Sequence, residues 1–232
     1  MKKTIITLLA LAGVAAAADS TQELWSLDFT GTSLNSSFAD GVSLSNLPTS
    51  GINNGLTLNN DPRTLTQTGS TLTYADEFVF SVNLQVNSHR GNYPELVGFG
   101  NSRHNWKGAY YVEDNNFVLD KNGFASSNET NNAVGDISVT LNTPITLSFK
   151  SDGAGTITMY VGDTVAGYTT IGDSYLGQTI DKFALGGRIN GKIANNADVT
   201  VYSASLTKIV PEPTTAALSL LALAGLAARR RR

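Results

Sequence analysis

The sequence contains no cysteine, and it has only two histidines, two tryptophans and two methionines. The absence of cysteine excludes a disulfide framework, a thiol nucleophile and a Cys-ligated zinc site. Between residues 19 and 209 no stretch has a long helical period, and no G-x-S-x-G sequence occurs. We therefore expect a domain of short strands that is stabilised by the burial of their apolar side chains.

Basic residues are scarce once the two ends of the chain are set apart. Six of the sixteen lysines and arginines lie in the first three and the last four residues, which leaves ten against nineteen acidic residues. A net charge of about -9 for the rest of the chain argues against nucleic acid as a partner. This part of the chain also has no basic amphipathic helix for a membrane surface.

The N-terminal segment has the three parts of a secretory signal peptide. Lys2 and Lys3 precede an apolar core at residues 4–14, and small residues follow, with Ala16 and Ala18 in an A-x-A arrangement. The sequence predicts a signal peptide over residues 1–18, cleaved after Ala18 by signal peptidase.

The C-terminal segment also has three parts in a fixed order. Pro211 and Pro213 lock the backbone on either side of Glu212 in an extended conformation. An Ala/Leu-rich, helix-prone run follows at residues 216–228. The chain then ends in a basic tail, which is expected to stay on the cytoplasmic side of a membrane: Arg229, Arg230, Arg231 and Arg232.

Residues 210–232 resemble the PEP-CTERM sorting signal of exported bacterial proteins, which has a Pro-Glu-Pro box, an apolar helix and a basic tail. The resemblance implies that an exosortase-type membrane enzyme cleaves near the box. The protein would then be anchored transiently in the inner membrane, with its C-terminus cytoplasmic, before it reaches the cell envelope, the outer surface or the extracellular matrix. A plain tail anchor without processing is an alternative, although residues 216–228 are fewer than the roughly 20 that span a bilayer.

Residues 19–209 have the pattern of one β-rich domain, with short apolar runs separated by Gly, Asn, Thr and Ser. Residues 80–87 alternate strictly between apolar and polar side chains, which predicts a strand with one buried face. Residues 145–150 and 156–161 alternate in the same way around an Asp-Gly turn, which predicts a hairpin. Weaker strands are predicted at residues 24–29, 55–59, 70–75, 95–100, 108–112, 116–120, 136–141, 182–186 and 198–207.

The order of these segments resembles that of LamG-type domains. The segments that carry the resemblance are Leu27-Asp28-Phe29, residues 77–84, 94–100, 145–149, 155–163, 183–188 and 199–207. The family's Tyr-Val-Asp-Gly turn reads Tyr160-Val161-Gly162-Asp163 here, with its last two residues exchanged. The resemblance implies an all-β, two-sheet antiparallel jelly-roll sandwich of the concanavalin A-like type.

The sequence does not contain the carboxylate pattern of a glycoside hydrolase. Sandwich glucanases place acids on alternate residues of one strand, as Glu-x-Asp-x-x-Glu, and hydrolysis needs two carboxyls about 5 to 10 Å apart. Here Asp76-Glu77 and Glu113-Asp114 are adjacent pairs, whose side chains point to opposite faces in a strand. His89 and His104 lie in polar segments and are expected at the surface. We therefore predict a protein without a catalytic site.

Aromatic side chains lie among hydrogen-bonding groups in two neighbouring loops, the arrangement by which proteins bind sugars. The candidate ligand-binding residues are Tyr93, Arg103, Asn105, Trp106 and Tyr110. Packing of these rings on the edge of the sandwich is the alternative. No cofactor is predicted, although residues 113–116 and 120–123 carry oxygen ligands of the kind that calcium uses.

The sequence thus predicts an exported, non-catalytic β-sandwich of the cell envelope that is associated with exopolysaccharide. A carbohydrate-binding or adhesive lectin-like module remains an alternative, with a glycan as its partner. A polysaccharide hydrolase is the second alternative, which two carboxylates in one cleft would support.

Overall fold

The computed structural model describes residues 20–59, 61–89, 95–101, 106–111, 117–119, 131–133, 140–187, 189 and 197–210. For residues 89, 95, 106–111, 117–119, 131–133 and 197 it describes the backbone alone. The chain divides into two compact units, one of which, Thr21–Ile209, holds the sandwich. The other comprises Met1–Ser20 and Val210–Arg232. The predicted signal peptide and sorting signal therefore lie outside the described residues, apart from Val210.

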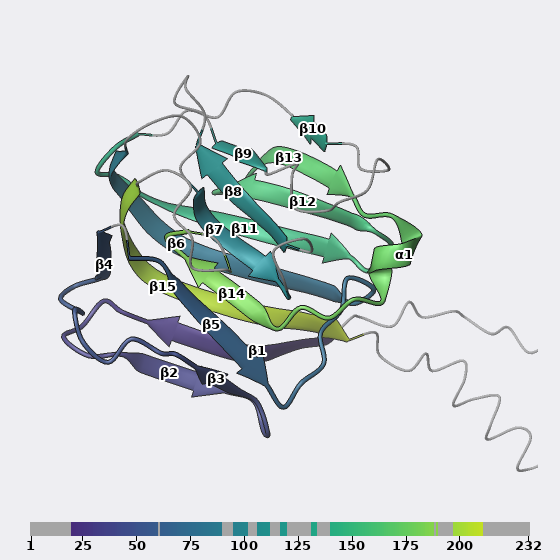
Figure 1. Ribbon diagram of the computed structural model, residues 1–232, viewed down its shortest axis with the longest axis horizontal. Helices are drawn as coiled ribbons and strands as arrows, with labels where there is room; N and C mark the ends of the chain where they lie inside the picture. The colour runs from purple at the N-terminus through teal and green to yellow at the C-terminus, as the bar shows by residue number, and fades with distance from the viewer. Residues whose placement is uncertain are drawn as a thin grey trace, which may run out of the picture. The chain divides into compact units, whose positions relative to one another are not determined.

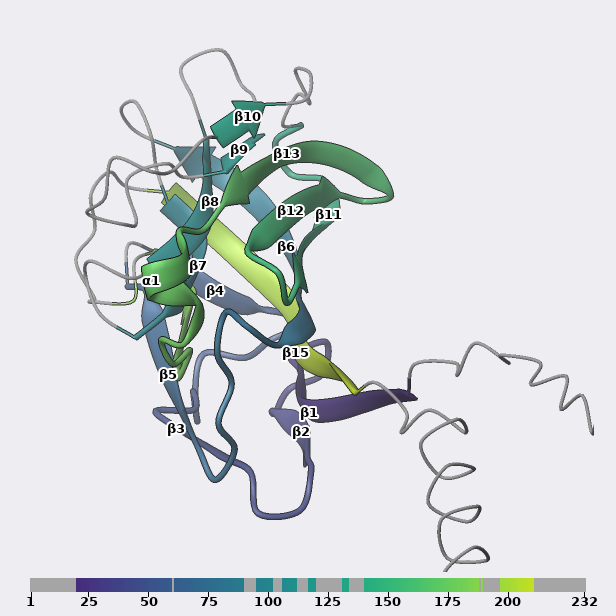
Figure 2. The ribbon, with the colours of Figure 1, turned by 90° about the vertical axis from the view of Figure 1, so that its right-hand side faces the viewer.

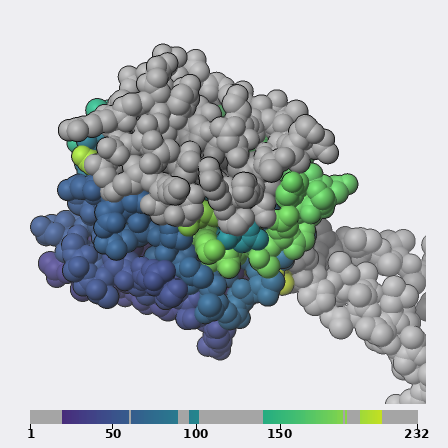
Figure 3. Space-filling view, in the orientation of Figure 1, coloured from purple at the N-terminus to yellow at the C-terminus, as the bar shows by residue number. Residues whose placement is uncertain are grey.

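Strands are the main secondary structure of the described residues (Figure 1). The strands are β1 (Ser20–Asp28), β2 (Asn35–Phe38), β3 (Ser43–Ser45), β4 (Leu56–Asn59), β5 (Arg63–Thr68), β6 (Glu77–His89), β7 (Glu95–Gly100), β8 (Trp106–Tyr111), β9 (Phe117–Leu119), β10 (Asn131–Ala133), β11 (Pro144–Asp152), β12 (Thr156–Val161), β13 (Thr164–Thr170), β14 (Lys182–Leu185) and β15 (Ala197–Val210). A single-turn helix, α1 (Asp173–Leu176), buries no residue and lies at the surface among the green residues of Figure 3.

Two antiparallel sheets face each other, which confirms the predicted fold class. The larger sheet has the order β10-β13-β12-β11-β6-β15-β1-β2, with β4 also paired to β15. The smaller sheet has the order β3-β5-β14-β7-β8-β9. Figure 2 shows the two layers, with β5, β7 and β8 in one and β6, β11 and β12 in the other.

An aromatic cluster fills the space between the sheets. Phe80 of β6 packs against Trp25 and Phe183 with ring centroids 6.0 and 5.1 Å apart. Phe99 of β7 packs edge-on against Phe149 of β11 at 5.3 Å. All five side chains are fully buried and come from both sheets, so the aromatic contacts themselves join the two layers.

The predicted hairpin forms as β11 and β12. Leu147 and Phe149 are buried, whereas Ser148 and Lys150 lie on the outer face, as the alternation indicates. The Asp152 carboxylate accepts hydrogen bonds from the backbone N–H groups of Ala154 and Thr156, each at 2.8 Å. The Asx-type turn therefore holds the strand ends together.

The predicted strand at residues 70–75 is wrong, because this segment forms a loop with one isolated bridge, Thr73 to Thr179. Leu72 and Tyr74 are nonetheless buried. The Leu72 carbonyl accepts a hydrogen bond from the Ile180 N–H at 2.7 Å, so the loop buries its apolar side chains without joining a sheet. The predicted strand at residues 136–141 lies mostly outside the described residues.

Candidate functional site

The five predicted ligand-binding residues fall in a part of the chain that is described sparsely. Tyr93, Arg103 and Asn105 lie outside the described residues. Trp106 and Tyr110 belong to β8, where the backbone register places them opposite Gly100 and Glu95 of β7. Only the backbone of these two positions is described, so the loop site stays a prediction.

The predicted terminal signals and calcium ligands also lie outside the described residues. These are Ala16 and Ala18; Pro211, Glu212, Pro213 and Arg229 to Arg232; and residues 113–116 and 120–123. Among the side chains that are described, no three His, Cys, Asp or Glu residues gather to hold a metal ion. In the same part of the chain no helix is long and apolar enough to cross a membrane.

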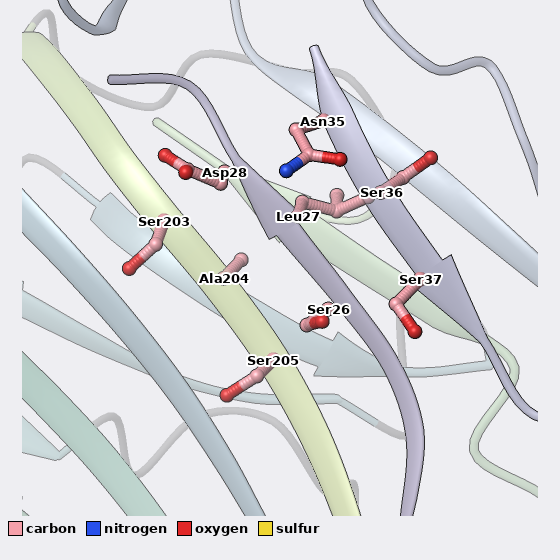
Figure 4. Close-up of a pocket in the computed structure, with 9 residues that line it drawn as sticks. All are labelled: Ser26, Leu27, Asp28, Asn35, Ser36, Ser37, Ser203, Ala204 and Ser205. Atoms are coloured by element: carbon pink, nitrogen blue, oxygen red, sulfur yellow. The ribbon is translucent and has the colours of Figure 1, made fainter. Parts of the chain in front are cut away.

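A depression of about 270 Å³ lies on the larger sheet, across β15, β1 and β2 (Figure 4). It is lined by Ser26, Leu27, Asp28, Asn35, Ser36, Ser37, Ser203, Ala204 and Ser205. Leu27 and Ala204 are buried beneath it, so the outward side chains are small and polar. Because serine side chains are short, they leave the depression open, whereas larger side chains at these positions would fill it.

The strand register brings the polar groups of the depression together. Ser26 pairs with Ser37, and Asp28 pairs with Asn35, in the antiparallel ladder of β1 and β2. Directly opposed residues of this kind have Cβ atoms about 4.5–5.5 Å apart on one face of the sheet. Figure 4 shows the Asp28 and Asn35 side chains at one end of the depression and the Ser205 and Ser37 side chains toward the other.

Asp28 is the one carboxylate among the residues that line the depression. Its Oδ1 accepts hydrogen bonds from the backbone N–H and the hydroxyl of Thr30, at 2.9 and 2.7 Å. These two bonds, the backbone one first, lower the pKa of the Asp28 carboxyl. The depression thus has a fixed negative charge at one end, together with an exposed amide from Asn35.

Neutral polar side chains continue across the outer face of the larger sheet. Ser81 and Ser148 hydroxyls hydrogen-bond at 2.8 Å, and Asn83 Nδ2 donates to Thr146 Oγ1 at 3.1 Å. Tyr202 Oη donates to Gln85 Oε1 at 3.0 Å. In contrast, the Ser203 and Ser205 hydroxyls make no hydrogen bond to any other described residue, so they remain available to a ligand.

Sequence reasoning missed this depression, although part of the signal was present. The alternation of Ser203, Ala204 and Ser205 marks a strand with small outward residues, and residues 24–29 were predicted as a strand. β2, however, reads Asn-Ser-Ser-Phe and has no apolar alternation. Its pairing with β1, and that of β1 with β15, depends on tertiary structure.

A comparison with protein-family models finds no match, and a comparison with curated proteins finds none either. Similarity is found among solved structures. A sialidase from Trypanosoma rangeli has a TM-score of 0.54 and 15% sequence identity, over 79% of this chain and 30% of the sialidase chain. The botulinum neurotoxin serotype G binding domain has a TM-score of 0.50 and 15% sequence identity, over 80% of this chain and 47% of the toxin-domain chain.

These likenesses establish the fold alone. A third structure, the binding domain of botulinum neurotoxin serotype D/C, matches 79% of this chain at 10% identity with a TM-score of 0.51. The chain spans less than a third of the sialidase and about half of each toxin domain. The likenesses are consistent with a concanavalin A-like sandwich. The LamG-type assignment within that fold stays a prediction.

Proposed function

We propose that this protein is an exported, non-catalytic module of the cell envelope that binds carbohydrate at the depression on the larger sheet. The observation that carries the proposal is the set of outward hydroxyls, with one amide and one carboxylate, around an open hollow. Sugar hydroxyls both donate and accept hydrogen bonds, and serine and asparagine side chains do the same. The sialidase that is similar in fold is described in complex with sialic acid, and the toxin segments are binding domains.

Binding rather than hydrolysis fits the groups that line the depression. Glycoside hydrolysis needs two carboxyls held about 5 to 10 Å apart, and Asp28 is the one carboxylate that lines it. Both Thr30 hydrogen bonds go to a single Asp28 oxygen, and they favour the ionised form over a proton donor. We expect no new reducing ends when the protein is incubated with a polysaccharide that it binds. Turnover that persists in an Asp28→Asn variant would place a catalytic site elsewhere.

A substitution that fills the depression tests whether it is the binding site. Ser203→Leu should abolish retention on a glycan array, because the larger side chain occupies the hollow. Thr158→Leu is the matched control, since Thr158 lies on the same sheet in β12, away from the depression. Trp106→Ala tests the predicted loop site in the same assay. If Trp106→Ala loses binding and Ser203→Leu keeps it, the ligand binds at the loops.

Export and sorting rest on the two ends of the sequence. The PEP-CTERM-like signal supports cleavage by an exosortase-type enzyme, after which the domain joins the surface or its exopolysaccharide. Replacing Pro211, Glu212 and Pro213 by alanine should leave export intact and cause the uncut protein to accumulate in the membrane. The intact mass of the mature protein reports both cleavage sites. A triple-alanine protein that matures to the wild-type mass would support the plain tail anchor.

A further inference from the structure

The first strand of the sandwich, β1, begins beside the end of the last strand, β15. The Ser20 hydroxyl donates to the Val210 carbonyl at 3.2 Å, and the Phe29 N–H donates to the Tyr202 carbonyl at 2.8 Å. These two bonds show that β1 runs antiparallel beside β15, from the start of β1 to its end. Figures 1 and 2 both show the start of β1 beside the end of β15.

The strand register shows what else lies at this end of the larger sheet. Lys208 of β15 pairs with Phe78 of β6, and the preceding residue of β6, Glu77, pairs with Asp152 of β11. The β11–β12 turn that follows Asp152 therefore lies at the end where β15 finishes. We call this the tether end, defined by Ser20, Val210 and the turn at residues 152–155.

The opposite end of the sheet is defined in the same way. Pro144, at the start of β11, pairs with Gln85, which also pairs with Thr200 of β15. The segment at residues 140–143 precedes Pro144, and the Asn142 N–H donates to the Val86 carbonyl at 2.8 Å. This distal end is separated from the tether end by the length of β11, about 30 Å for nine residues at 3.3 Å each.

We infer that the tether end of the sandwich faces the lipid bilayer while the chain is anchored, and that the distal end points away from it. The inference rests on the membrane anchoring in the proposed function. Pro211 follows the last strand residue directly, so no spacer separates the sandwich from the sorting signal. From Val210 to residue 216 the chain reaches at most about 20 Å, less than half the length of the 14-residue strand β15. A tether this short holds the sandwich by one end.

This orientation leaves the depression open during anchoring. Ser205 lies five residues before Val210, about 17 Å along the strand from the point of attachment. The depression is on a face that runs along β15 and β1, not on either end of the sandwich. The module can therefore hold a glycan before the C-terminal cleavage as well as after it.

The absence of cysteine makes the orientation directly measurable. Ala154→Cys at the tether end and Thr143→Cys at the distal end replace exposed residues at the two ends of β11. Each full-length variant is labelled with a fluorescent donor and reconstituted into phosphatidylcholine vesicles that contain an acceptor-labelled lipid. Energy transfer should be strong from position 154 and roughly halved or lower from position 143, because about 30 Å of strand separates the two.

A spacer variant provides the matched control. About 20 Gly/Ser residues inserted between Val210 and Pro211 lengthen the tether by a flexible coil of about 25 Å, which should remove the difference between the two positions. Equal transfer from both positions without the spacer, or stronger transfer from position 143, would overturn the orientation while leaving anchoring intact. A chain that fails to float with the vesicles would instead overturn the anchoring, and the orientation with it.

Discussion

The indole N–H of Trp25 donates a hydrogen bond to the side-chain oxygen of Gln67 at 2.8 Å, between two buried residues that belong to different sheets. Trp25 lies on β1 of the larger sheet, and Gln67 lies on β5 of the smaller one. The Gln67 amide nitrogen in turn donates to the Ser70 carbonyl at 3.3 Å. The polar groups of both side chains are thus satisfied inside an otherwise apolar core.

Removing one partner of this bond should destabilise the sandwich. Gln67→Leu keeps the volume but leaves the indole N–H buried without an acceptor, which should lower the free energy of unfolding by about 1–3 kcal/mol. The double variant Gln67→Leu/Trp25→Phe should lose less free energy of unfolding than the sum of the losses in the two single variants, as measured by urea denaturation. Strict additivity would contradict a direct coupling.

Phe149 should be among the most sensitive positions of the β11–β12 hairpin. Its ring is fully buried against Phe80 and Phe99, so Phe149→Ala should lower the free energy of unfolding by about 3–5 kcal/mol. The adjacent Ser148→Ala should lose no more than about 1 kcal/mol, because Ser148 is half-buried on the outer face and gives up one hydroxyl contact. Chemical denaturation compares the two, and similar losses would contradict the assignment of faces.

Gly69 should not tolerate a side chain. It has φ +83°, and a Cβ atom there would overlap the Gly41 carbonyl oxygen. Gly162 provides the matched control, with φ +59° and nothing within 4 Å of the same atom. Gly162→Ala should lower the free energy of unfolding by about 1 kcal/mol, because of its left-handed backbone alone. Gly69→Ala should lower it by roughly 3 kcal/mol or more. Thermal or urea unfolding measures both. Equal losses would mean that the β2–β3 loop moves aside freely.

Asp76 should make stability depend on pH. Its carboxylate pairs with Lys208 Nζ at 2.7 Å and accepts the Thr73 N–H at 2.8 Å. Partial burial acts to raise the pKa of the Asp76 carboxyl, but the bonds and charge from Lys208 and Thr73 outweigh it and lower that pKa. A lowered native pKa adds stability that is present above the unfolded-state value of about 3.9 and is lost as the pH falls through the native value.

The Asp76→Asn variant tests this linkage. Its free energy of unfolding should be about 1–2 kcal/mol below that of the wild type at pH 7. The difference should shrink as the pH falls below about 4. Asp61→Asn is the control. The side chains of the Asp61–Arg63 ion pair are 67% and 46% exposed, so this pair should contribute little to the free energy of unfolding. A difference for Asp76→Asn that is constant from pH 7 to pH 3 would rule out the ion pair as its source.

The strands predicted most clearly from the sequence were those with an apolar residue at every second position. β6 and β12 have this alternation, and their inward residues are buried. β13 and β5 were missed because their inward positions include polar residues, Thr169 and Gln67, both of which are fully or almost fully buried. A buried glutamine is stable here because Trp25, from another sheet, donates to it, and no local pattern reveals that partner.

The opposite error occurred at Leu72 and Tyr74. Alternating apolar residues predicted a strand, but the hydrogen bonds of this segment go to residues 178–180 in the loop before β14. The depression could not be predicted for a related reason: its three strands come from residues 20–38 and 197–210. Their proximity results from sheet order, which period-two patterning leaves open.

The central position of β15 determines when this fold can form. β15 pairs with β6 along one edge and with β1 and β4 along the other, so the last strand of the sandwich joins both parts of the larger sheet. Until residues 199–206 are available, β1 and β2 have no strand that connects them to β6 and the rest of the larger sheet. Closure therefore waits for the far end of the chain, because these long-range pairings cannot form before residues 199–206 are present. A polypeptide threaded through a translocation pore from its N-terminus would stay unfolded until nearly all of it had passed, with no folded domain to obstruct the passage.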